Sequence, residues 1–138
     1  MSLIQLVYSS RPFGFDLSMM GNILMRSRRN NARDDITGAL ICRADLYLQW
    51  LEGPQAAVEA TYAKILKDDR HLDIVMRVRR ITTERLFPQW SMRDDPAEGW
   101  LWTREDVDSG ALDRAEASDY IAVFERVRDL ATNLSAPS

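Results

Sequence analysis

The sequence predicts an α+β sandwich of the ferredoxin-like class, with two helices on one face of a mixed, five-stranded sheet. Strand-like and helix-like segments follow one another in the order β-α-β-β-α-β-β over residues 3–94. Right-handed crossovers place both helices of such a chain on the same side of the sheet. A length of 138 residues is enough for one domain with its own core.

The first strand and the first helix occupy the N-terminal quarter of the chain. Residues 3–10 (LIQLVYSS) are apolar on both faces, which is typical of a central strand. Asp16 or Ser18 can cap a helix over about 17–31, where apolar side chains recur at helical spacing. We therefore expect a buried strand followed by an amphipathic helix.

A hairpin and a second helix come next. Residues 36–43 and 46–52 have the composition of strands and are separated by a two-residue turn, Ala44-Asp45. Pro54 suits the first position of a helix. The apolar stripe of that helix consists of Val58, Tyr62, Ile65 and Leu66.

Two further strands complete the predicted sheet. Residues 74–81 alternate, which predicts a strand with Ile74, Met76 and Val78 on one face. Residues 89–94 (QWSMRD) predict a short fifth strand, on which Trp90 and Met92 share a face.

The remainder of the chain differs in character. Thr103 begins a helix-start signal, and a longer amphipathic stripe follows at Tyr120, Phe124, Val127, Ala131 and Leu134. This part has too few apolar residues for a separate core, so it must dock elsewhere. Leu48 and Trp50 point to the sheet face opposite Gln49. We expect a domain over 1–96 and a C-terminal helical extension over 97–138 that caps this reverse face.

Bulk properties exclude several classes of function. The net charge of −3 argues against bulk nucleic-acid binding. The single cysteine, Cys42, allows no internal disulfide and favours a reducing cytoplasm. No segment predicts a signal peptide or a membrane span. The one histidine argues against a metal site rich in histidine, so we expect no metal.

Polar side chains converge toward the helix-covered face. Gln49 stands in an apolar strand, and an unpaired buried amide costs about 1–3 kcal/mol. Tyr8 ends the first strand and Asn31 ends the first helix. The other expected members of this group are Trp90, Met92 and two apolar walls, Ile23 and Ile65. In-plane amides between apolar walls suit a planar heteroaromatic ligand.

Four motifs carry a resemblance to a known family. These are VYSS around Tyr8, SRRNNARDDITGALICRADLYLQWLEG (27–53), DDRH (68–71) and FPQWSM (87–92). In this order and spacing, residues 3–94 resemble the BLUF family, the blue-light sensors that use flavin. The resemblance implies a noncovalently bound flavin between the two helices, usually FAD, with FMN as the other form.

The resemblance also implies roles for individual residues. Tyr8 would donate an electron and a proton to the photoexcited flavin. Gln49 would bridge Tyr8 and the flavin ring, and Asn31 would hold the ring edge. Trp90 and Met92 would sense the change in the glutamine. The remaining flavin-contacting positions are matched by Ile23, Ser27, Ile65, Asp68, Arg70 and His71.

The expected function is a reversible, red-shifted signalling state without enzymatic activity. About forty residues follow the sensor, too few for an output enzyme domain. Output would then pass through a protein partner, and a homodimer would form through the sheet face or the C-terminal helices. Two alternatives remain open: a small enzyme acting on an aromatic ligand, and a flavin-free protein-interaction module. Colour distinguishes them, because a flavin sensor purifies yellow.

Overall fold

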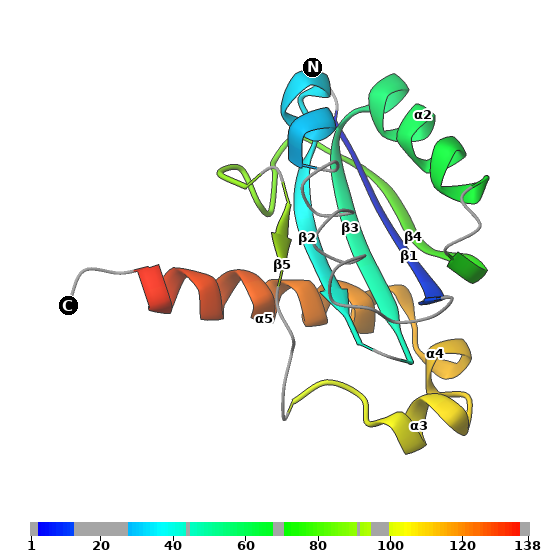
Figure 1. The fold of residues 1–138 in the computed structure, drawn as a ribbon. Helices are drawn as coiled ribbons and strands as arrows, with labels where there is room; N and C mark the ends of the chain where they lie inside the picture. The colour runs from blue at the N-terminus through cyan, green and yellow to red at the C-terminus, as the bar shows by residue number, and fades with distance from the viewer. Residues whose placement is uncertain are drawn as a thin grey trace.

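The computed structural model of the chain describes residues 3–12, 28–43, 45–67, 71–90, 92–94 and 100–135. Their strands form one sheet in the order β4-β1-β3-β2-β5 (Figure 1). The strands are β1 (Leu3–Pro12), β2 (Thr37–Cys42), β3 (Tyr47–Pro54), β4 (His71–Thr82) and β5 (Arg93–Asp94). The predicted ferredoxin-like class is confirmed, with the apolar strands β1 and β3 at the centre of the sheet.

The fifth strand is shorter than predicted. The first four strands pair antiparallel, whereas β5 has only two residues and pairs parallel with β2 at Ala39 and Leu40. Residues 88–89 form a turn, so the extended conformation expected from residue 89 onward begins only at Arg93. Pro88 favours that turn because its ring fixes φ and removes a backbone donor.

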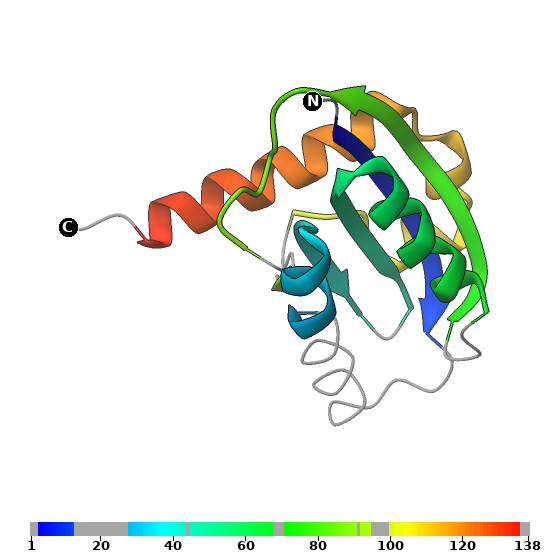
Figure 2. The same ribbon diagram turned by 90° about the horizontal axis from the view of Figure 1, so that it is seen from above.

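Two helices cover one face of the sheet. Residues 28–34 are helical, and α2 spans Gln55–Leu66 directly after Pro54. Figure 2 shows both on the same side of the sheet, as the crossover rule predicts. The buried residues beneath them form the helix-face cluster: Ile4, Leu6, Tyr8, Ile36, Leu40, Tyr47, Leu51, Val58 and Met92.

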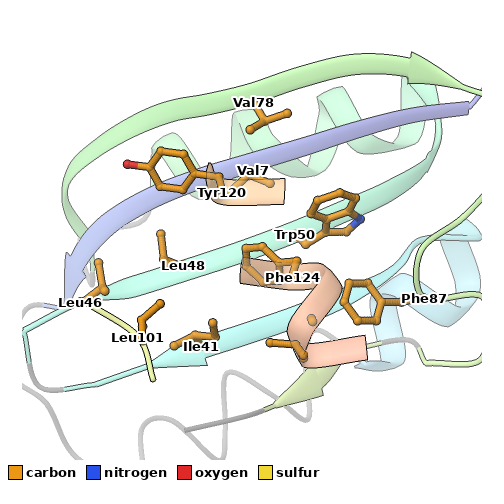
Figure 3. Packing of buried hydrophobic residues seen from close by; sticks show 12 residues of the cluster. Val7, Ile41, Leu46, Leu48, Trp50, Val78, Phe87, Leu101, Tyr120 and Phe124 are labelled. Atoms are coloured by element: carbon orange, nitrogen blue, oxygen red, sulfur yellow. The ribbon is translucent and has the colours of Figure 1, made fainter. Parts of the chain in front are cut away.

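The C-terminal helices pack on the opposite face, as expected. They are α3 (Arg104–Asp108), α4 (Ala111–Arg114) and α5 (Ala117–Ser135). Thr103 caps α3 through a capping box with Asp106. The reverse-face cluster, most of which is labelled in Figure 3, consists of Val7, Ala39, Ile41, Leu46, Leu48, Trp50, Val78, Phe87, Leu101, Tyr120, Phe124 and Val127.

The predicted alternation along β4 is wrong in part. Val78 joins the reverse-face cluster, but Ile74 packs against the helix-face cluster. The register with β1 shifts between Val7, opposite Val78, and Tyr8, opposite Met76. This irregularity adds one residue to β4 and turns the side chains before it to the other face.

Candidate functional site

Tyr8 and Gln49 form the centre of the candidate site. They are direct cross-strand partners on β1 and β3, and they are 0% and 3% exposed. The Tyr8 hydroxyl donates a hydrogen bond to Gln49 Oε1. A phenol and an amide are therefore already connected donor to acceptor in a water-poor interior.

The Gln49 amide nitrogen has only a weak acceptor. Gln49 Nε2 donates to Met92 Sδ at 3.4 Å, and a thioether is a poor acceptor. The amide carries two N–H groups, and within the described part of the chain no other side chain accepts from it. An amide N–H that is buried without a strong acceptor is consistent with a bound ligand that supplies an acceptor beside Gln49.

Aromatic rings surround the phenol. The Tyr8 ring centroid lies 6.0 Å from that of Tyr47 and 5.8 Å from that of Tyr62. Burial raises the pKa of Tyr62, which is consistent with a region of low polarity. Ile65 packs against the same cluster from α2, and its contact with a ligand stays a prediction.

Asn31 is buried within the helical segment 28–34. Its backbone carbonyl accepts a hydrogen bond from Ile36 N at 2.8 Å, which fixes the start of the hairpin relative to the helix. Arg28, on the same segment, donates to the Met92 carbonyl at 3.0 Å. The segment that carries Asn31 is thereby held to the residue that faces Gln49.

The expectation that Trp90 and Met92 share a face is wrong. Met92 lies in the helix-face cluster against Gln49, whereas Trp90 packs on the reverse-face cluster. The Trp90 ring lies 6.2 Å from that of Phe87, centroid to centroid. The two residues precede β5, so the alternation of a regular strand does not apply to them.

Four predicted site residues fall outside the described part of the chain: Ile23, Ser27, Asp68 and Arg70. The backbone of His71 begins β4, and its side chain is also not described. Their roles remain predictions.

The sequence analysis missed a buried carboxyl group. Glu52, at the end of β3, is 0% exposed and accepts five hydrogen bonds. The sequence contains one indication of this buried glutamate, which is its position in the strand. Side-chain alternation places Glu52 on the same face as Leu48 and Trp50. A charged residue expected on an apolar, covered face requires partners.

The described parts of the chain give little support for a metal site or a reactive thiol. Within them, no group of three or more His, Cys, Asp or Glu side chains is placed to hold a metal ion. Burial raises the pKa of the Cys42 thiol to about 11, so the reactive thiolate is scarce near neutral pH. The helices among the described residues are too short or too polar to cross a bilayer.

Comparison with known proteins agrees with this geometry. Residues 3–93 match the family model of BLUF, described as sensors of blue-light using FAD. The chain is 34% identical over 93 residues to photoactivated adenylate cyclase subunit beta of Euglena gracilis, covering 66% of this chain and 10% of that protein. It thus spans about a tenth of the length of this relative.

Solved structures give the same result. The dark-state structure of the BLUF protein BlrB has a TM-score of 0.70 and 31% identity, covering 88% of this chain and 96% of that one. A bacterial light-regulated adenylyl cyclase has a TM-score of 0.65 and 30% identity, covering 94% and 36%. The chain belongs to the BLUF family, whose domains are flavin-using blue-light sensors and not themselves enzymes.

Proposed function

We propose that this chain senses blue light through a noncovalently bound flavin, in the form of FAD, between the helical segment 28–34 and α2. The observation that carries the proposal is the buried series Tyr8, Gln49 and Met92, in which the central amide donates, among the described residues, only to a thioether. Asn31, Gln49 and Ile65 would contact the ring. The roles of Ile23, Ser27, Asp68, Arg70 and His71 belong to the same proposal.

The chemistry follows from the phenol and the amide. A bound flavin would supply a one-electron oxidant on absorbing blue light. Tyr8 would give up one electron, and its hydroxyl proton would pass along the existing hydrogen bond to Gln49 Oε1. An amide can accept a proton at oxygen and release one from nitrogen. One electron and one proton would leave Tyr8, and the same number would return to it on recombination.

The Gln49 amide would be left rotated or tautomerised after recombination. The donor that it then presents to the ring would form a stronger hydrogen bond there, and absorption would move to the red. Met92 contacts the amide nitrogen and would register the change. No covalent bond to the ligand persists, so the state reverts in the dark.

We also propose that output passes through a protein partner. A route from Met92 to the segment with Trp90 and Phe87 would reach Phe124 of α5, whose ring lies 6.4 Å from that of Phe87, centroid to centroid. α5 extends past the edge of the sheet (Figure 1). We propose that its projecting part supports a homodimer or binds the partner. A cytoplasmic location is proposed from the unpaired Cys42.

The alternative of an enzyme acting on an aromatic ligand gains no support from the side chains around Gln49. Those described offer a phenol, a thioether and apolar groups. A general base is required for most such reactions. The flavin-free alternative is decided by the spectrum described next.

The test is an absorption spectrum of the purified protein, taken in the dark and after blue light. We expect a flavin spectrum that shifts to the red and relaxes in darkness. A flavin spectrum that does not shift would remove Tyr8 and Gln49 from their roles. A colourless protein that fails to take up FAD on reconstitution would overturn the proposal.

A further inference from the structure

Glu52 forms the most densely bonded polar group in the described part of the molecule. Oε1 accepts from Leu86 N at 2.8 Å, Trp50 Nε1 at 2.9 Å and Gln5 Nε2 at 3.1 Å. Oε2 accepts from Phe87 N at 2.7 Å and Thr37 Oγ1 at 2.9 Å. Five donors match an ionised carboxylate, which only accepts hydrogen bonds.

These donors come from two parts of the fold. Trp50, Gln5 and Thr37 belong to three neighbouring strands of the sheet. Leu86 and Phe87 belong to the connection between β4 and β5, and their backbone amides point at the carboxylate. Hydrogen bonds to a charged acceptor are about twice as strong as neutral ones. Glu52 therefore ties that connection to the sheet.

A further layer orients the partners. Arg80 Nε donates to Gln5 Oε1 at 2.7 Å, which leaves the Gln5 amide nitrogen directed at Glu52 and at the Glu84 carbonyl. Arg85 donates to Thr37 Oγ1 at 2.9 Å. Because Thr37 and Gln5 are each held by an arginine, the carboxylate sits in a preorganised site.

Met92 lies in the connection between β4 and β5, which Glu52 ties to the sheet. After Phe87 the chain is held by the bond from Gly38 N to Trp90 O at 3.1 Å and by the two residues of β5. A side chain at position 38 would collide with the Trp50 carbonyl, which a Cβ would approach to 1.8 Å. Among the described residues, Arg28 Nε also donates to the Met92 carbonyl at 3.0 Å. The anchor at Glu52 fixes where this connection begins at the sheet, and so contributes to where Met92 lies.

We propose that Glu52 is a positioning residue for the Gln49 photochemistry. It fixes the start of the connection that places Met92 against the Gln49 amide, and so sets the barrier that the amide crosses when the dark state returns. This inference rests on the proposed function. A loosened connection gives the amide more room to rotate, so the return becomes faster.

The test compares three variants of the full chain reconstituted with FAD. Glu52→Gln keeps the size of the side chain but turns one acceptor into a donor that faces other donors. Thr37→Val removes a single donor from Oε2. Glu84→Gln is the matched control, because this exposed glutamate lies in the same connection and forms its hydrogen bonds there through its backbone. The readouts are the dark recovery rate, the size of the red shift and the melting temperature.

We expect Glu52→Gln to recover about tenfold faster than the wild type, a change of about 1.4 kcal/mol in the barrier. Thr37→Val should change recovery in the same direction by a smaller factor, and Glu84→Gln should leave it unchanged. If Glu52→Gln does not fold, Thr37→Val decides: faster recovery supports the inference and an unchanged rate overturns it.

The inference and the proposed function fail in different ways. A wild-type protein with a normal, reversible shift, together with a folded Glu52→Gln that recovers at the wild-type rate, overturns only the role of Glu52. A lower melting temperature in that variant without a change in recovery has the same meaning, because the role is then only structural. A wild-type protein without any shift overturns the proposed function and this inference with it.

Discussion

The proposed photochemistry depends on one pair of side chains. Tyr8 and Gln49 face each other across β1 and β3, so the sheet register itself sets their contact. A slip of one residue in either strand would turn that strand's side chain to the opposite face and separate the pair. Gln49 is the member of the pair that also contacts Met92, and its substitution is the more informative.

Replacing Gln49 with Leu should abolish the red shift while flavin stays bound. Leucine fills a similar volume but offers neither a donor nor an acceptor. Difference spectra before and after blue light measure the effect. Gln55→Leu serves as the control, since Gln55 is exposed on α2 and bonds to Glu59. A normal shift in Gln49→Leu would rule out the mechanism.

Replacing Tyr8 with Phe should preserve flavin binding and prevent formation of the red-shifted state. The ring remains, but the hydroxyl that supplies the proton is gone, and loss of its hydrogen bond should cost about 1 kcal/mol of stability. Tyr62→Phe is a matched control, because Tyr62 lies 5.8 Å from the Tyr8 ring without a bond to Gln49 among the described residues. A complete photocycle in Tyr8→Phe would remove Tyr8 from its role.

At the level of helices, Tyr120 joins α5 to α4 and to the sheet. Its hydroxyl donates to the Leu112 carbonyl at 2.5 Å, and its ring packs edge-on against Trp102. Arg77 of β4 lies over the Tyr120 ring and forms an ion pair with Asp113. The docking of α4 and α5 thus includes a phenol that must stay neutral.

Stability should fall in alkaline solution for this reason. Burial raises the pKa of Tyr120 to about 12, whereas an unfolded tyrosine has a pKa of about 10. Because the pKa is higher in the folded state, the contribution of neutral Tyr120 to the free energy of unfolding is complete below about pH 10. It is lost as the pH rises toward 12. Urea unfolding between pH 8 and about 12 would measure it. Tyr120→Phe should flatten that decline, and an equally steep decline in the variant would contradict the assignment.

Across the whole molecule, the two buried clusters lie on opposite faces of one sheet. Gln49 and Met92 lie on the side of the helix-face cluster, while Phe87 and Phe124 lie on the side covered by the C-terminal helices. The connection between β4 and β5 contributes to both clusters. We therefore propose this connection as the route by which a change beside a bound flavin reaches α5.

Blue light should change hydrogen exchange in α5 if this route carries the signal. We expect amides of α5 near Phe124 to exchange at a different rate in the light than in the dark. Exchange measured by mass spectrometry, with Gln49→Leu as the dark-locked control, tests this. Equal rates in light and dark for the wild type would exclude α5 from the output route.

Sequence reasoning worked where local pattern and global fold agree. The apolar runs of β1 and β3 identified the centre of the sheet, and Gln49 is buried there as expected. Alternation in β3 placed Leu48 and Trp50 beneath the C-terminal helices. These features depend on residue type and on the two-residue period of a strand, and both can be read from the chain.

The tertiary structure alone decided what depends on irregular backbone and on distant partners. The bulge beside Tyr8 and the turn before β5 break the two-residue period, so the sides on which Ile74 and Trp90 lie were not predictable. The five donors around Glu52 come from segments up to 47 residues away along the chain, and no local pattern indicates them. The sequence by itself determined the class of fold, the central amide and the family resemblance, because these rest on composition and spacing. The structure determined the anchor of the connection and the side on which Trp90 lies, because both follow from long-range packing.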